Sequence, residues 1–133
     1  MPTLIASDVI IQAELGAFDL SAWLISQPHE EFRLAAITVA ELWQGAERAT
    51  GIHRTKRRLL LRRIFETFEI VPYGGPAALE HARLGAELES TVQPIAPYDL
   101  MLAAMAIHSG NAVATFNGRQ FSPVKGLKVV EPR

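Results

Sequence analysis

Short, almost wholly apolar runs alternate along the chain with longer segments in which apolar residues recur every three or four positions. A run of strand length without polar alternation is typical of a strand buried on both faces, as in a parallel sheet. This pattern predicts four strands, at residues 3–6, 32–37, 68–71 and 112–115, and a candidate fifth strand at residues 127–130.

The segments between these runs have helical periodicity and are bounded by Asp, Gly and Pro residues. Asp19 is placed to cap the second of them, and the last is apolar on nearly every side, so we expect it to be buried. Strands alternating with helices indicate one α/β domain over residues 1–133, with a parallel sheet sandwiched by helices. The predicted helices span residues 9–16, 20–26, 38 to about 49, 53–67, 77–90 and 97–109.

Composition sets the broad class of the protein. The chain has 133 residues, 49% of them apolar and 20% charged, which is typical of one globular domain. It contains no cysteine, which excludes a disulfide framework, a thiolate zinc site and a thiol nucleophile. No apolar run is long enough to span a membrane, and the first residues lack the basic start of a secretory signal. We therefore expect a cytoplasmic protein without a membrane partner.

Charge is unevenly distributed along the chain. The net charge of −1 argues against a general polyanion binder, but residues 48–63 hold seven of the 13 basic residues and no acidic one. This basic segment is either a surface that grips a nucleic-acid backbone or a solvated face or docking surface for an acidic partner. The candidate nucleic-acid contacts are Arg54, Arg57, Arg58, Arg62 and, later in the chain, Arg119.

Four polar residues follow predicted strands or begin predicted helices: Asp8, Glu41, Asp99 and Asn117. In an α/β sheet, ligands bind outside the carboxyl ends of the strands, so we expect these four side chains to converge at one edge. Dispersed carboxylates can hold Mg²⁺ or Mn²⁺, which prefer oxygen ligands, activate water and stabilise charge on a phosphodiester. No phosphate-binding glycine loop, serine elbow or histidine metal motif is present.

Each of these residues also has a purely structural interpretation. Thr38 and Glu41 have the spacing of a capping box, and Asp8 could cap the first helix. Asp99 suits the first turn of a helix through the helix dipole, although an unpaired charge entering so apolar a helix would be costly. Asn117 precedes a glycine, as in many turns. The sequence leaves these alternatives open.

Three segments resemble a known family. AITVAELWQGAER at residues 36–48, PIAPYDLMLAAMA at residues 94–106 and ATFNGRQF at residues 114–121 look like the downstream motifs of PIN-domain ribonucleases. The resemblance is greatest to the VapC-type toxins of bacterial toxin–antitoxin pairs. It extends over nearly the whole chain, in the same order and with similar spacing.

The resemblance implies a Rossmann-like PIN domain with four to five central strands. It implies cleavage of RNA with Mg²⁺ or Mn²⁺, neutralisation by a small cognate antitoxin, and a homodimer. In this family the second and third acidic residues fall on Glu41 and Asp99, and the fourth polar position falls on Asn117. The implied catalytic residues are thus Glu41, Asp99 and Asn117, and the implied metal ligands are Asp8, Glu41 and Asp99.

The first motif departs from the family. An ungapped match places Ala6 where the family has a metal-binding Asp, and Ala cannot coordinate a metal. Either Asp8 replaces the missing carboxylate, or Ala6 is an engineered replacement, or the chain has lost catalysis. The last possibility gives a second hypothesis, a catalytically silent module that binds an antitoxin or RNA. No residue specifies the RNA target.

Overall fold

The computed structural model describes all 133 residues and contains one sheet of five parallel strands. The strand order is β3-β2-β1-β4-β5, and every neighbouring pair runs parallel. The predicted α/β class is confirmed, and the candidate fifth strand is present. The strands are β1 (Thr3–Ile5), β2 (Phe32–Ala35), β3 (Glu69–Val71), β4 (Ala112–Ala114) and β5 (Val129–Val130).

Six α-helices and one 3₁₀ helix connect the strands, and every predicted helix is present. None of them is both long enough and apolar enough to cross a membrane. Asp19 caps α2 as predicted, its side chain accepting a hydrogen bond from the Ala22 amide at 3.0 Å. The helices are α1 (Ser7–Glu14), α2 (Leu20–Ser26), α3 (Ala36–Arg48), α4 (Gly51–Thr67), α5 (Gly75–Glu89), α6 (Pro97–Ser109) and the 3₁₀ helix η1 (Gly118–Phe121).

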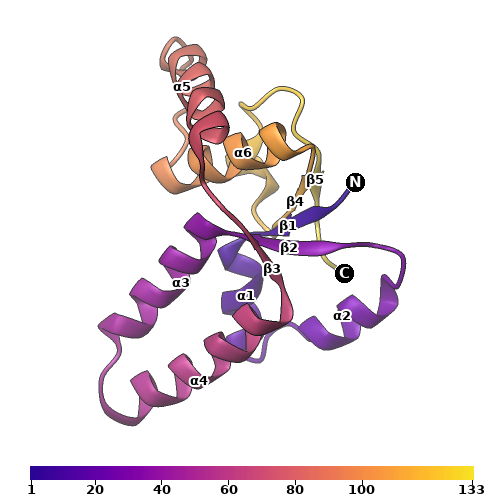
Figure 1. Ribbon diagram of the computed structural model, residues 1–133, viewed down its shortest axis with the longest axis vertical. Coiled ribbons are helices and arrows are strands. Elements are labelled where there is room, and N and C mark those ends of the chain that lie inside the picture. The colour runs from indigo at the N-terminus through magenta and orange to yellow at the C-terminus, as the bar shows by residue number, and fades with distance from the viewer.

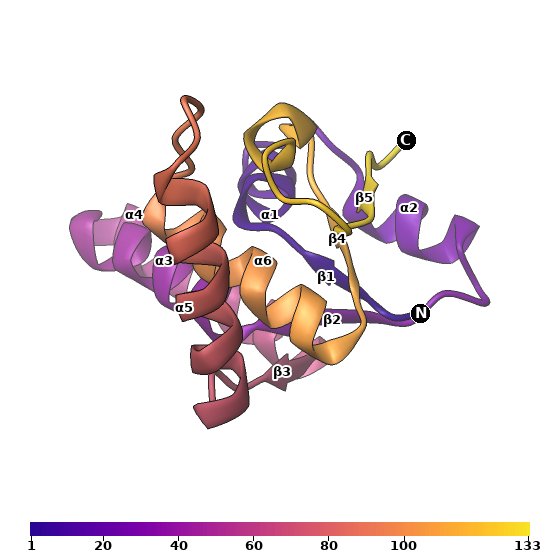
Figure 2. The same cartoon turned by 90° about the horizontal axis from the view of Figure 1, so that it is seen from above.

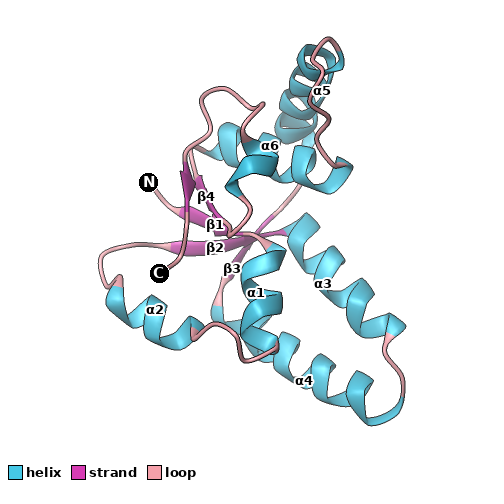
Figure 3. Ribbon diagram, turned by 180° about the vertical axis from the view of Figure 1, so that it is seen from behind, coloured by secondary structure: helices cyan, strands magenta, loops and turns pink.

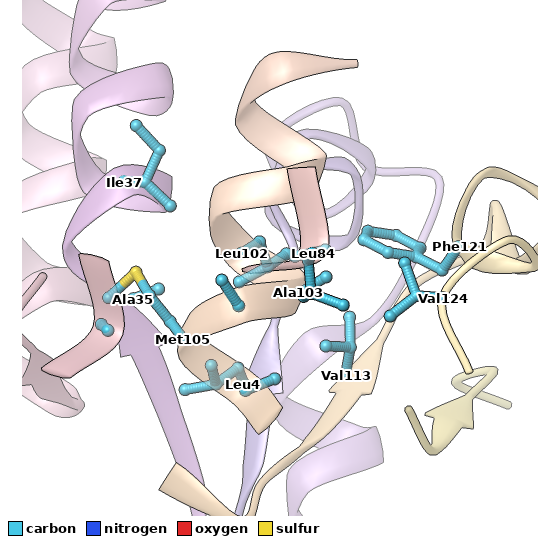
Figure 4. Close-up of a cluster of buried hydrophobic side chains, with 14 of the residues drawn as sticks. Leu4, Ala35, Ile37, Leu84, Leu102, Ala103, Met105, Val113, Phe121 and Val124 are labelled. Atoms are coloured by element: carbon cyan, nitrogen blue, oxygen red, sulfur yellow. The ribbon is translucent and has the colours of Figure 1, made fainter. Parts of the chain in front are cut away.

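Helices cover both faces of the sheet (Figure 1). On one face α5 and α6 pack on Leu4 and Val113, and η1 closes the end of this core with Phe121 (Figure 4). On the other face α1, α2, α3 and α4 pack on Ile5 and Ala114 (Figure 3). Successive residues of the central strands thus enter different cores, which explains why these strands are largely apolar instead of alternating apolar and polar residues.

The order in which the chain adds strands to the sheet reverses at β1. From β1 the chain moves outward to β2 and β3, and it then returns to add β4 and β5 on the other side of β1. The carboxyl ends of β1 and β4 therefore diverge into different connections and leave a crevice between them, the usual ligand position in such sheets. Figure 2 shows α6 crossing above the central strands.

The junction between β2 and α3 differs from the predicted one. The apolar run at residues 32–37 is strand only to Ala35, and α3 begins at Ala36. The capping box is wrong, because the N-cap is Ala35 and Thr38 lies inside the first turn. The Thr38 hydroxyl is buried and has no hydrogen-bond partner. The carboxylate of Glu41 is therefore not occupied in capping its own helix.

The arginines of α4 have partners inside the domain. Arg54 donates hydrogen bonds to the Ala49 and Glu47 carbonyls at the end of α3. Arg58 pairs with Glu47, and the guanidinium of Arg62 lies over the Trp43 ring, 5.1 Å from its centroid. Much of the charge on this helix therefore fastens α4 to α3.

Arg57 makes the most buried ion pair of the domain. Its Nε donates to Glu14 of α1 at 2.8 Å, and the Glu14 side chain is only 9% exposed. The guanidinium crosses α3 directly above Gly45, where a Cβ would lie 2.5 Å from Nη1. Gly45 is therefore the residue that lets α4 reach α1 across α3.

Replacing Arg57 with Ala should lower the free energy of unfolding by about 1.5–3 kcal/mol, because Glu14 would keep a largely buried charge without its partner. Urea denaturation measures this loss. Arg83→Ala is the matched control, since its pairs with Glu80 and Glu87 are exposed on one helix. The control should lose clearly less than Arg57→Ala, because solvent screens exposed ion pairs.

Gly45→Ala tests the close approach separately. In the Arg57→Ala background the added methyl group meets no guanidinium, so helix propensity should raise stability by up to about 1 kcal/mol. In the parent chain the same change displaces Arg57 and should lose that benefit. Equal effects of Gly45→Ala in both backgrounds would contradict the coupling.

Candidate active site

A cleft of about 370 Å³ opens at the carboxyl edge of the sheet, between the ends of β1 and β4. It is lined by residues that follow β1 and β4, by Glu41 of α3, by the start of α6, and by η1. Residues far apart in sequence thus meet here, and no Lys, Arg or His is among the lining residues. The polar side chains of the cleft are Ser7, Asp8, Glu41, Tyr98, Asp99, Thr115, Asn117 and Gln120.

Glu41 enters the cleft from the second turn of α3 and is half-buried. Burial raises the pKa of its carboxyl group above the ordinary value, and the neighbouring charges of Asp99 and Asp8 raise it further. A hydrogen bond from the Ser7 hydroxyl to Glu41 Oε2, at 3.4 Å, acts in the opposite direction. Glu41 therefore stays partly protonated to a higher pH than an exposed glutamate.

Asp99 lies in the first turn of α6, two residues after the proline that begins the helix. Burial raises its pKa, and the charge of Asp8 adds to the effect. The helix dipole that suits an acid at this position is not sufficient to offset burial among other carboxylates. Glu41 and Asp99 thus form a half-buried acidic pair without a basic partner.

Asp8 is held more firmly than the other two acids. The Thr115 hydroxyl lies 3.0 Å from both of its carboxylate oxygens, and the Phe116 amide donates to Oδ2 at 2.8 Å. Asp8 therefore bridges the end of β1 to the end of β4. It is not the cap of α1, because the N-cap is Ala6.

Ala6 lines the cleft and lies immediately after β1. It is 5% exposed, and its amide donates to the Ala114 carbonyl at 2.9 Å. The position that carries a carboxylate in the resembling family is thus a methyl group in the cleft wall. Asp8, two residues further on, is tied to Thr115 and Phe116.

Asn117 follows β4 and is the N-cap residue of η1. Its side chain makes no capping hydrogen bond, so its carboxamide is free to face the cleft. The Asn-Gly pair therefore begins a 3₁₀ turn. Side chains three residues apart eclipse in a 3₁₀ helix, which accounts for Gln120 lining the same cleft.

None of the candidate arginines lines the cleft, and only Arg119 lies on an element that does. None of Arg54, Arg57, Arg58 and Arg62 lines the cleft, and α4 extends away from the sheet edge where the cleft opens (Figure 3). Arg119 is on η1, whose other residues Gln120 and Phe121 line the cleft, and it is exposed and makes no ion pair. Its binding to nucleic acid stays a prediction, as does that of the other four.

The chemical groups in the cleft are of the types that bind a hard divalent cation. All of its polar groups are hydroxyls, carboxylates or carboxamides, and burial, together with the charge of neighbouring carboxylates, raises the pKa values of Glu41 and Asp99, whose negative charge a cation would neutralise. No three acidic or histidine side chains are arranged to hold one ion as they stand. A site of two carboxylates completed by water is common for Mg²⁺.

Comparison with known proteins gives the family. The profile of the PIN domain matches residues 5–127, nearly the whole chain. The chain belongs to the PIN domain family. Its VapC character follows from the tRNA(fMet)-specific endonuclease VapC of Salmonella typhimurium, which is 30% identical over 96 residues, 72% of this chain and 71% of that protein.

Solved structures confirm the PIN fold. VapBC2 from Rickettsia felis, bound to a DNA fragment from its promoter, superposes with a TM-score of 0.90 at 18% identity over the whole of both chains. A toxin–antitoxin complex from Klebsiella pneumoniae superposes with a TM-score of 0.70 at 20% identity over 98% of each chain. The predicted Rossmann-like α/β architecture is thus confirmed.

Four polar residues of the PIN cleft were missing from the predicted site: Ser7, Tyr98, Thr115 and Gln120. None of them has the charge that marks a ligand in a sequence. The place of Tyr98 beside Asp99 and the spacing of Gln120 three residues after Asn117 were the available signs. The four predicted residues Asp8, Glu41, Asp99 and Asn117 all reach the cleft, although their roles are not tested by position alone.

Replacing Glu41 with Gln should raise the melting temperature of the metal-free PIN domain by a few degrees at neutral pH. The folded pKa values of Glu41 and Asp99 exceed the unfolded ones, so their contribution to stability is present at low pH and lost as pH rises through the raised values. Gln removes one of the two repelling charges. Thermal unfolding in EDTA at several pH values measures the difference.

The gain should vanish below about pH 4, where an ordinary Glu is itself largely protonated. Glu89→Gln is the matched control, because Glu89 is exposed on α5 and makes no ion pair. A melting temperature that falls in Glu41→Gln at neutral pH would mean that the Ser7 hydrogen bond outweighs the repulsion.

Proposed function

We propose that this PIN domain is a metal-dependent endoribonuclease of the toxin class, with its active site in the acidic cleft. The observation that carries the proposal is the half-buried pair Glu41 and Asp99, with Asp8 beside them. These residues lie at the carboxyl edge of the sheet, where the strand order reverses. Unpaired buried carboxylates are costly to a fold and are typical of sites that take a cation. The VapC relative named as an endonuclease supports the same activity.

In this proposal Glu41 and Asp99 hold Mg²⁺ or Mn²⁺ directly, and Asp8 adds its charge from the position fixed by Thr115 and Phe116. When bound, such an ion supplies an activated water and stabilises charge on a phosphodiester. The carboxamide of Asn117 orients a water or a phosphate oxygen at the mouth of the cleft. Arg119 is the basic residue best placed to contact a phosphate nearby.

Ala6 supports a second candidate, a catalytically silent PIN module that binds RNA or an antitoxin. With a methyl group in the cleft wall, the site has one carboxylate fewer than the family pattern that it resembles. Fewer anionic ligands weaken divalent cation binding, because water must fill the vacant coordination position. Ala6 therefore predicts weak metal binding. The effect of changing this residue distinguishes an impaired enzyme from a binding module.

Changing Ala6 to Asp should strengthen Mn²⁺ binding by about tenfold or more, because it adds a carboxylate to the cleft that Glu41 and Asp99 line. Calorimetric titration measures the affinity, and an RNA cleavage assay follows each variant. Glu41→Ala and Asp99→Ala should abolish binding, whereas Glu89→Ala should leave it unchanged. RNA cleavage that appears only with Asp at position 6 would establish the nuclease cleft and its impairment in this chain.

Unchanged Mn²⁺ affinity in both Glu41→Ala and Asp99→Ala would overturn the metal assignment. Tight binding by the parent chain that is lost in Asp8→Asn would show that Asp8 replaces the missing ligand. A chain that binds RNA but cleaves none, even with Asp at position 6, would favour the silent module.

We also propose that a small cognate antitoxin binds this chain at two places. An antitoxin arginine would pair with Glu41 and Asp99, since bidentate pairing suits buried carboxylates. An apolar helix of the antitoxin would fill the hollow between α1 and α4, which is lined by the exposed side chains of Ile11, Leu15 and Leu60.

His53 and Lys56 border the same hollow, so an acidic amphipathic helix is the complementary partner. Leu61 and Ile64 of α4 belong to the core, and no residue of α2 lines the hollow.

Leu15→Asp should weaken antitoxin binding at least about tenfold, because it places a charge in the apolar hollow. The measurement is a pull-down after co-expression with the product of the adjacent small reading frame, followed by titration of the purified complex. Leu79→Asp, on the far face at α5 and equally exposed, is the control. Ala6→Asp should retain the complex, and joint neutralisation of Glu41 and Asp99 should weaken it.

A complex that tolerates Leu15→Asp would place the antitoxin helix elsewhere. A complex indifferent to the two carboxylates would remove the arginine contact while leaving the docking hollow in place.

A further inference from the structure

Tyr98 is an aromatic ring left without a partner at the rim of the acidic cleft. It is 41% exposed, it lines the cleft, and it packs on no other aromatic ring. Tyr73 shows the contrast, because its hydroxyl shares a hydrogen bond with Nδ1 of His81 at 2.7 Å and its ring packs edge-on against that imidazole. Nothing in the domain itself explains the position of Tyr98.

The ring is nevertheless held in a defined place. Ala96 is the N-cap of α6 and Pro97 is its first residue, which fixes the backbone on which Tyr98 and Asp99 project. Ala96 and Pro97 also line the cleft and are exposed, so they extend the apolar surface of the ring. An apolar ledge thus lies directly beside the carboxylates.

The charge of the cleft limits what can bind to this ledge. Asp8, Glu41 and Asp99 repel a phosphate backbone wherever a cation does not intervene, so a bound strand needs neutral contacts at the rim. An aromatic face supplies such a contact, because every nucleobase has a π-face and stacking on Tyr needs no charge. The carboxamide of Gln120, exposed and unpaired in the same cleft, can donate to and accept from a base edge.

We propose that Tyr98 is a substrate-positioning residue on which an unpaired base stacks, next to the phosphate that enters the acidic cleft. This inference rests on the proposed ribonuclease function. Stacking requires a base that has left its own helix, so the ring would select RNA that is unpaired at the bound position. Gln120 then contacts the edge of the stacked base.

The test measures RNA binding in EDTA, where metal-dependent cleavage cannot occur. The probe is a short single-stranded RNA of mixed sequence that carries 2-aminopurine at successive positions, with a duplex of the same sequence beside it. Tyr98→Ala should weaken single-strand binding about 5- to 150-fold, the range that corresponds to one base–aromatic stack. Tyr98→Phe keeps the ring and should bind as the parent chain does.

In complexes of the parent chain and Tyr98→Phe, 2-aminopurine fluorescence should be quenched at a restricted position, and the quenching should disappear in Tyr98→Ala. Duplex binding should not depend on residue 98. Leu79→Ala removes an exposed apolar side chain far from the cleft and should change neither readout.

Equal single-strand binding by the parent chain and Tyr98→Ala would overturn this inference and leave the ribonuclease proposal intact. Failure of the parent chain to bind or cleave any RNA would overturn both. Loss of antitoxin binding in Tyr98→Ala, with RNA binding unchanged, would assign the ring to a protein partner instead.

Discussion

Burial of both faces of a sheet with very short strands is the constraint on which the rest of the structure depends. The strands are two to four residues long, so each of the central strands β1, β2 and β4 contributes only one or two side chains to each core. Leu4 and Ile5 on β1, and Val113 and Ala114 on β4, divide in this way. Because the strand positions that enter the cores are apolar, the polar side chains of the cleft occupy positions where strands end and helices begin.

This constraint also explains what could be predicted from the sequence. Uninterrupted apolar runs revealed the strands, and the rule that parallel strands end at one edge placed Asp8, Glu41, Asp99 and Asn117 together. The start of α3 could not be predicted, because Ala36 and Ile37 continue the apolar run of β2 without a break. The contacts of Asp8 with Thr115 and Phe116 join residues more than a hundred positions apart, and no local pattern encodes them.

The basic side chains of α4 and the acidic side chains of the cleft differ in whether they have partners of opposite charge. The basic segment of α4, the most conspicuous charge feature of the sequence, has much of its charge matched by Glu14, Glu47, backbone carbonyls and the Trp43 ring. The acids of the cleft, scattered along the sequence, meet without any basic residue among them. A chain with a net charge of only −1 therefore keeps a negative site, since none of its cations lines the cleft.

The crossing of Arg57 above Gly45 has a consequence for how the sequence can diverge. The residues at positions 14, 45 and 57 depend on one another, because a side chain at position 45 would block the path along which Arg57 reaches Glu14. A lineage that acquires a larger residue at position 45 would be released from selection for the Glu–Arg pair, and one that loses the pair would be free to replace the glycine. Substitutions at these three sites should therefore arise together along evolutionary branches, although none of the three lines the acidic cleft.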